Sequence, residues 1–293
     1  MKPTLNILTA ALILNVLVAG GASAQTPTTQ PTAAPAVVKE VRGQLAASVN
    51  NAGLQETTEW SWRRSLNSSQ NVLLSEAHIA AGTSVGITPA SLRGGAWVEV
   101  APVSFFVLKA GIDPSQYFGN FDSVTSLDRR DEMFDTDARQ ARANAKAGRN
   151  VKFYMEPTLQ FRRGPLSGQS SLTFERWSSS ASGPFFYEPT RDTLLSVSGD
   201  HLATWSTVVL LKSEAGRGVS TSIGPMYSPM RVHGNRANQV QKIGAVVVLQ
   251  TGPQFLPRAL PSVTILVSRY LDDPNKMGQW SAALAIGFNL KRR

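Results

Sequence analysis

A two-residue period of apolar and polar side chains is the feature that most restricts the fold of this sequence. It is clearest between Val151 and Arg162, where odd-numbered positions are apolar and even-numbered positions carry polar groups. Successive side chains of a strand point to opposite faces, whereas a helix of period 3.6 would mix the two sets. The segment therefore predicts a β-strand with one apolar face and one polar face.

The same period returns along the chain and ends in Trp280–Leu290, whose second face carries small and polar residues. The segments are about ten residues long, which suits a strand that crosses a bilayer at barrel tilt and exceeds the usual soluble strand. We expect about twelve strands, with about 10 or about 14 as alternatives, because bacterial single-chain barrels have even numbers. The approximate spans are 38–49, 56–64, 75–87, 92–101, 104–116, 149–162, 170–178, 201–212, 218–228, 238–250, 261–271 and 279–290.

The composition excludes two other classes of protein. Charged residues make up 17% of the 293 residues, below the roughly 25% of a typical soluble domain. After residue 20, no uncharged apolar run approaches the about 20 residues that a membrane helix needs. The sequence thus predicts an all-β transmembrane antiparallel up-and-down barrel. A soluble β-sandwich or ligand-binding barrel would alternate in the same way, but strand length and the weakly charged second face argue against it.

The first residues predict export. Lys2 precedes an apolar stretch over residues 5–18 and an Ala-x-Ala cleavage site that ends at Ala24, as in a cleaved signal peptide. Three prolines among Thr, Gln and Ala then predict an extended or flexible tether. The predicted organisation is a signal peptide over 1–24, a tether over 25–37 and a barrel domain over 38–293.

The longest predicted connections, 117–148 and 179–200, follow the fifth and seventh strands and therefore lie on the same, outer side of a barrel. In the first of them, Asp135 or Thr136 can cap a helix over 137–146 that Gly148 stops. Its basic residues form an edge that could attract lipopolysaccharide phosphates, although a solvated helix face is the favoured interpretation. These residues are Arg139, Arg142 and Lys146.

The combination of signal, tether and amphipathic strands resembles a bacterial outer-membrane β-barrel protein of porin-like architecture, over nearly all of residues 38–290. The segment Ala285–Leu290 is similar to the final strand that the barrel-assembly machinery recognises. It departs from that pattern because Leu290 replaces a terminal Phe and three basic residues follow. The resemblance implies an outer-membrane location and, as partners, outer-membrane lipids, lipopolysaccharide and the barrel-assembly machinery.

Aromatic residues near predicted strand ends could form the two girdles that anchor a barrel among lipid headgroups. For any one residue an ordinary core or turn position is equally compatible with the sequence. The predicted girdle consists of Trp60, Trp62, Trp177, Trp205, Tyr227, Tyr270 and Trp280.

Ionisable residues on the faces opposite the lipid-facing set predict a lumen that is either wet or filled with paired charges. A barrel of about twelve strands lies between sizes that side chains fill and sizes that leave a channel, so both interpretations stay open. The predicted lumen-facing set is Glu76, Glu99, Lys109, Lys152, Glu156, Arg162 and Glu175.

The sequence contains few candidates for catalysis. Zero cysteines exclude disulfides and thiolate chemistry, and the three histidines lie too far apart for a local metal motif. Glu76 with His78, or Ser198 and Asp200 with His201, could supply acid–base or nucleophilic groups, but a satisfied histidine and an ordinary loop are favoured. Asp135 and Asp137 form only a fragment of a calcium loop. We expect no enzyme activity, cofactor or metal.

The predicted function is a small passive channel for polar solutes with a mild preference for anions. A structural or surface-interaction barrel without an open pore is the alternative, and a lipid-hydrolysing barrel the third. The net charge of +9 does not predict nucleic-acid binding, because the basic residues are not clustered on one element. A monomer or weak oligomer is expected.

Overall fold

The computed structural model describes residues 37–50, 53–67, 71–142, 147–214, 219–233, 235–251 and 261–292. The predicted signal peptide and all of the predicted tether except Val37 lie outside the described residues. In the described part of the chain, no helix has both the length and the apolar character to cross a membrane.

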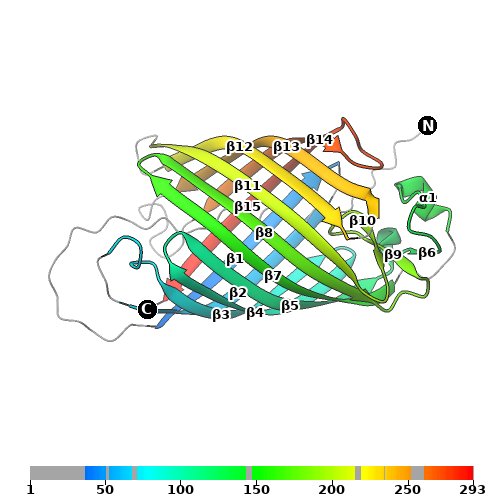
Figure 1. The fold of residues 1–293 in the computed structure, drawn as a ribbon, viewed down its shortest axis with the longest axis horizontal. Helices are drawn as coiled ribbons and strands as arrows, with labels where there is room; N and C mark the ends of the chain where they lie inside the picture. Colours follow the sequence, from blue (N-terminus) through cyan, green and yellow to red (C-terminus); the bar gives the residue numbers. More distant parts are fainter. Residues whose placement is uncertain are drawn as a thin grey trace.

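Twelve antiparallel strands form a closed barrel (Figure 1), which confirms the predicted fold class and strand number. Each barrel strand pairs with the next barrel strand along the chain, and β1 pairs with β15 to close the ring. The pairs β5–β7 and β8–β11 are joined by the two longest connections. The barrel strands are β1 (Val37–Val49), β2 (Gly53–Ser65), β3 (His78–Thr88), β4 (Ser91–Val103), β5 (Phe106–Phe118), β7 (Ala147–Arg163), β8 (Leu166–Ser179), β11 (Asp200–Glu214), β12 (Val219–Val232), β13 (Asn235–Thr251), β14 (Ser262–Asp272) and β15 (Trp280–Arg292).

The first and last strands close the barrel. Val49 of β1 pairs with Ala282 of β15, and the ladder continues to Lys39 and Arg292. Closure gives the backbone groups of both terminal strands partners, which a sheet in lipid needs because no water satisfies an open edge. The final strand therefore extends through two of the basic residues that follow Leu290.

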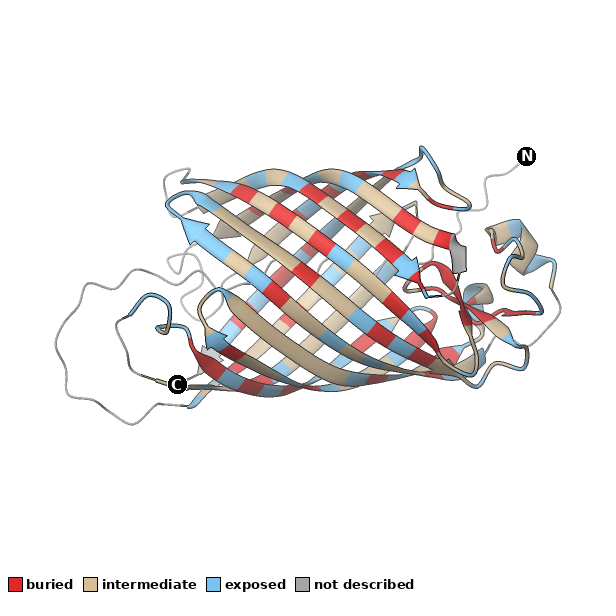
Figure 2. Ribbon diagram, viewed as in Figure 1, coloured by how far each residue is buried: buried red, intermediate tan, exposed pale blue. Residues whose placement is uncertain are grey.

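The strand period places apolar side chains on the outside of the barrel, and on β7 it places polar side chains on the inside. Along β7, Phe153 and Leu159 are 52% and 55% exposed, whereas the intervening Thr158 is 7% exposed. The same alternation runs around the barrel wall (Figure 2). A soluble protein buries its large apolar residues, so this outer surface is suited to lipid and not to water.

Aromatic rings cover glycines on the neighbouring strand at four places, and in each case the two residues are directly opposed. Outside the barrel, Phe288 lies over Gly43 at the closing pair and Phe161 lies over Gly168. Inside, Trp97 and Tyr154 cover the glycines opposite them, Gly82 and Gly111. These rings shield backbone that has no side chain of its own, a device that stabilises sheets.

We predict that Gly43→Ala weakens the closing pair. A Cβ on Gly43 would lie 2.2 Å from the Phe288 ring, which has to move and uncover the backbone. The free energy of unfolding should fall by about 1–3 kcal/mol, the usual cost of overpacking, measured by urea unfolding from lipid vesicles. Gly94→Ala is the matched control, because a Cβ on that lipid-facing glycine has nothing within 4 Å. Equal midpoints for the two variants would contradict the role of the ring.

The two longest connections follow the fifth and seventh barrel strands, as predicted, and together build a second sheet at one barrel end (Figure 1). This sheet has the order β10–β9–β6 and consists of β6 (Ser126–Leu127), β9 (Phe185–Glu188) and β10 (Thr193–Ser196). The β5–β7 connection also contains the 3-10 turn η2 (Asn120–Asp122) and helix α1 (Thr136–Gln140).

Helix α1 is shorter than the predicted helix over 137–146. Asp135 caps it as expected, since its carboxylate accepts a hydrogen bond from Ala138 N at 2.8 Å. Gly148, predicted to end the helix, instead lies in β7, where it pairs with Tyr117. The prediction of the C-terminal end was wrong, since α1 ends at Gln140 and the chain from Ala147 onward pairs with β5. Residues 143–146 of the predicted helix lie outside the described residues.

Candidate functional site

The small sheet closes the barrel at the long-connection end, and we call β6, β9 and β10 with the turn between β9 and β10 the plug. Phe186 of β9 and Leu195 of β10 are fully buried. They pack in one cluster with inward-facing residues from six barrel strands, Tyr117, Trp177, Leu202, Met230, Val232, Val240 and Tyr270. Loop residues thus fill the mouth of the barrel with apolar side chains.

The opposite face of the plug is covered by the β5–β7 connection. Leu127, Tyr187 and Leu194 form a second cluster with Phe134, whose ring centroid lies 5.9 Å from that of Tyr187. Alternate residues of β9 and β10 serve the two faces, because successive strand side chains point in opposite directions. The plug is therefore a layer packed on both sides, between the barrel mouth and a covering loop.

Buried charges attach the plug to the barrel wall. Arg191, in the turn between β9 and β10, donates from Nε to Glu175 of β8 at 2.7 Å, and the Glu175 side chain is fully buried. Asp192 in the same turn pairs with Lys276 of the β14–β15 connection. Tyr187 also donates to Asp192, at 2.6 Å. The two ion pairs join the plug to two parts of the barrel that are distant in sequence.

Burial shifts the pKa values of two ionisable side chains in the plug, Arg191 and Glu188. It lowers the pKa of Arg191 to about 10, which leaves the guanidinium charged at neutral pH. Burial also raises the pKa of Glu188, against hydrogen bonds from Thr190, Tyr117 and Asn150 that favour its charged form. Tyr117 lies in β5 and Asn150 in β7, so Glu188 ties the plug to a third section of the wall.

We predict that Arg191→Ala loosens the plug and leaves the barrel closed. Removing one partner of a buried ion pair costs about 3–5 kcal/mol, since the other charge stays buried without it. Amides of residues 185–196 should exchange with deuterium much faster, while those of β3 and β4 do not change. Arg129→Ala, which breaks an exposed ion pair with Asp131, is the control. Unchanged exchange in the Arg191 variant would contradict the anchoring role.

The wall formed by β1–β5, β7 and β8 carries most of the inward-facing ionisable residues of the described chain, and many of them pair with one another. Lys152 lies 2.7 Å from Asp113 and 3.8 Å from Glu175. Lys109 lies 3.5 Å from Glu59 and over the Trp97 ring. The structure places six residues of the predicted lumen set on inward positions of their strands: Glu99, Lys109, Lys152, Glu156, Arg162 and Glu175.

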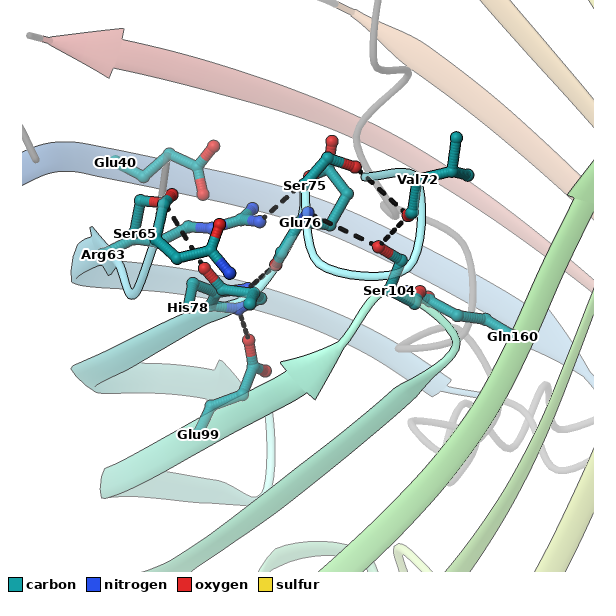
Figure 3. Close-up of polar contacts among 12 residues, drawn as sticks. Glu40, Arg63, Ser65, Val72, Ser75, Glu76, His78, Glu99, Ser104 and Gln160 are labelled. Carbon is teal, nitrogen blue, oxygen red and sulfur yellow. Dashed lines mark hydrogen bonds and ion pairs between the residues drawn. The ribbon is translucent and has the colours of Figure 1, made fainter. Parts of the chain in front are cut away.

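Glu76 is the exception, because it lies in the β2–β3 connection (Figure 3). Its carboxylate pairs with Arg63 at 3.3 Å, and its backbone carbonyl accepts from His78 Nδ1 at 2.7 Å. His78 Nε2 lies 2.9 Å from Glu99 Oε1. Placing Glu76 on a strand face beside His78 was wrong, because β3 begins at His78. Both ring nitrogens face acceptors, as in a satisfied lumen histidine.

The opposite wall, formed by β11–β15, is largely apolar on its inner face. Val208, Met226 and Leu266 are 2–3% exposed and belong to one cluster with Leu210, Val246 and Val248. The sequence reasoning missed this wall. Both faces of the strands in 201–250 contain apolar side chains, so the sequence pattern does not show which apolar set faces the lumen. The lumen consequently has one charged side and one apolar side.

Five of the seven predicted girdle aromatics face outward. Trp60, Trp62, Trp205 and Trp280 are 41–63% exposed, and Tyr227 lies on an outward position of β12. The prediction was wrong for Trp177 and Tyr270, which are 3% and 1% exposed inside the mouth. Trp177 shares its strand face with Glu175, two residues earlier, and donates to it at 2.9 Å. Tyr270 occupies an inward position of β14, whose orientation the sequence pattern leaves open.

The predicted basic edge is not a free surface in the described chain. Arg139 lies over the Tyr187 ring, 4.0 Å from its centroid, and donates to the Phe134 carbonyl oxygen. Arg142 pairs with Glu132. Lys146 lies outside the described residues. Both described arginines thus stabilise the cover of the plug.

The residues Ser198, Asp200 and His201 do not converge. Asp200 accepts from Ser196 N at 2.9 Å and pairs with Arg130, while Ser198 lies 2.9 Å from the Ser196 hydroxyl. His201 follows Asp200 in β11, so the two side chains point to opposite faces of the barrel wall. This geometry gives no nucleophile–base–acid arrangement.

Comparison with known proteins finds no matching family model and no matching curated protein. Solved structures of similar architecture include the KdgM porin, 8% identical with a TM-score of 0.40 over 87% of this chain and 99% of that chain. The β domain of the Bordetella autotransporter Brka is 10% identical with a TM-score of 0.48, over 89% and 100%. The NanC porin is 10% identical with a TM-score of 0.40, over 86% and 98%.

The closed ring of twelve strands, its apolar exterior and a lumen lined on one side by charged residues define the class. The chain has the architecture of an outer-membrane β-barrel protein, as the sequence predicts.

Proposed function

We propose that this protein is an outer-membrane channel for small polar solutes whose outer mouth is closed by the plug in the described state. In this orientation the connections that form the plug lie outside the cell, and both ends of the barrel domain face the periplasm. The predicted signal peptide over 1–24 supplies the export route to that location.

The observation that carries the proposal is the unequal exposure of inward-facing side chains at the two barrel ends. Near the terminal end, the side chains of Arg42 and Lys109 are 36% and 24% exposed although they point into the barrel. At the plug end, Phe186, Leu195 and Tyr270 are at most 1% exposed. A lumen with accessible charged side chains at one end and a sealed mouth at the other suits a gated passage better than a permanently open one.

A closed structural barrel is the second candidate, and the buried apolar wall of β11–β14 favours it. Those side chains fill space that a general porin leaves to water. The charges of the β1–β8 wall pair with one another, so the anion preference expected from net charge stays a prediction.

Conductance separates these two functions. In planar bilayers, the unmodified chain should conduct rarely, whereas Arg191→Gln combined with Lys276→Gln should spend much more time open. Both substitutions remove charges that fix the plug turn to the barrel and leave all twelve strands intact. Lys212→Gln, which alters a pair with Glu214 at the far end of β11, is the control.

If the double variant stays silent while hydrogen exchange shows a released plug, the channel function is excluded and the closed structural barrel stands.

A further inference from the structure

Three basic residues lie on the outer surface of the barrel wall, close to the plug end, and we call them the rim patch. They are Arg176 of β8, His201 of β11 and Arg231 of β12, and all three are exposed. Each is at most three residues from the end of its strand. The three strands are neighbours in the ring (Figure 1), so the patch lies on one side of the barrel.

Strand register brings the three side chains together. Arg176 is directly opposite His201. Arg231 is opposite Ala203, the next outward position after His201. Directly opposed residues have Cβ atoms about 4.5–5.5 Å apart, and diagonal neighbours about 7–8 Å. The rim patch therefore occupies one small area of the outer surface.

No carboxylate of the wall neutralises the rim patch. In the halves of β7, β8, β11 and β12 next to the plug, outward positions carry no Asp or Glu. Glu175, which precedes the patch residue of β8, points inward and is bound to Arg191. Asp200, which precedes that of β11, points inward and pairs with Arg130. Neither arginine of the patch takes part in an ion pair within the part of the chain that the structure describes.

Exposed aromatic rings border the rim patch on the membrane side. Phe153 is directly opposite Arg176, and Phe174 precedes Arg176 on the same strand face. The Arg176 guanidinium extends the other way, toward the mouth, since a Cβ on Gly199 would lie 3.5 Å from its Nε. Long basic side chains at the edge of a membrane place their charged group among the lipid headgroups in this manner.

The chemistry of the rim patch suits phosphate. A guanidinium group binds phosphate oxygens through two parallel N–H donors, and an imidazole N–H can donate another hydrogen bond. A ligand that meets both these donors and the aromatic rings has to combine a phosphorylated head with hydrocarbon chains. Lipopolysaccharide of the outer leaflet is such a molecule, because its lipid A part carries phosphates beside its acyl chains.

We propose that the rim patch binds the phosphate groups of a lipopolysaccharide molecule in the outer leaflet. The acyl chains of this lipid lie along the outward rings of Phe153, Phe174 and Trp205. The inference rests on the barrel orientation in the proposed function, which places the plug outside the cell. It goes beyond the channel, since the site lies on the lipid side of the wall and not in the lumen.

Native mass spectrometry of the refolded full-length chain in detergent micelles tests the patch with lipid A as the probe. Lipid A should bind in preference to phosphatidylglycerol, because a pair of phosphates matches the two arginines. Lipid A that lacks one phosphate should bind several-fold more weakly. Arg176→Gln combined with Arg231→Gln should weaken lipid A binding about tenfold or more.

Arg64→Gln combined with Arg163→Gln is the matched control. It also removes two exposed, outward-facing arginines, but at the other end of the barrel. This control should bind lipid A as the unmodified chain does. Heat-modifiable gel migration verifies that every variant folds.

Equal lipid A affinity in the two double variants would overturn the proposal. Phosphatidylglycerol bound as tightly as lipid A would overturn the assignment to lipopolysaccharide. The measurement needs no current, so a barrel that binds lipid A at the patch and never conducts refutes the channel alone. A barrel that conducts without a preference for lipid A refutes the rim patch alone.

Discussion

Closure of the backbone hydrogen-bond ladder between β1 and β15 is the constraint on which the rest of the structure depends. In lipid no water satisfies an open sheet edge, so the twelve strands are stable as a ring or not at all. Because successive side chains of a strand point to opposite faces, the ring fixes whether each barrel side chain faces the lipid or the lumen. A register shift of one residue in any strand would exchange its lipid-facing and lumen-facing sets. The ring also gathers alternate connections at one end, where the plug forms.

The plug depends on the barrel for both of its packing surfaces. It is a sheet of three short strands, and so small a sheet is marginal alone. Phe186 and Leu195 complete a cluster that the barrel strands begin, and the turn containing Arg191 and Asp192 reaches the wall at two points. The plug forms a sheet of its own, so the opening proposed above would not require the hydrogen-bond ladder of the ring to break. Below it, the division into charged and apolar walls gives the lumen two chemically different sides.

The strand pattern predicts the barrel well because the alternation of apolar and polar residues can be recognised within a single strand. Val151–Arg162 reveals its two faces without any partner strand, and the predicted spans 56–64 and 170–178 correspond to β2 and β8. The plug could not be predicted in this way. Its strands are two to four residues long and pair between connections that are about 60 residues apart in sequence. Trp177 and Tyr270 were predicted to be girdle residues because they lie near strand ends, but their positions along the strand place both side chains on the inner face.

Labelling of single cysteines tests the central claim most directly, because the chain contains no cysteine of its own. Three variants in lipid vesicles suffice: Leu211→Cys on the outer face, Glu59→Cys in the wet part of the lumen, and Leu195→Cys in the plug. A water-soluble thiol reagent should modify the Glu59 variant readily and the other two slowly, and a lipid-soluble reagent should modify the Leu211 variant fast. Rapid modification of the Leu211 variant from water would contradict the membrane barrel. Rapid modification of the Leu195 variant would contradict the closed mouth.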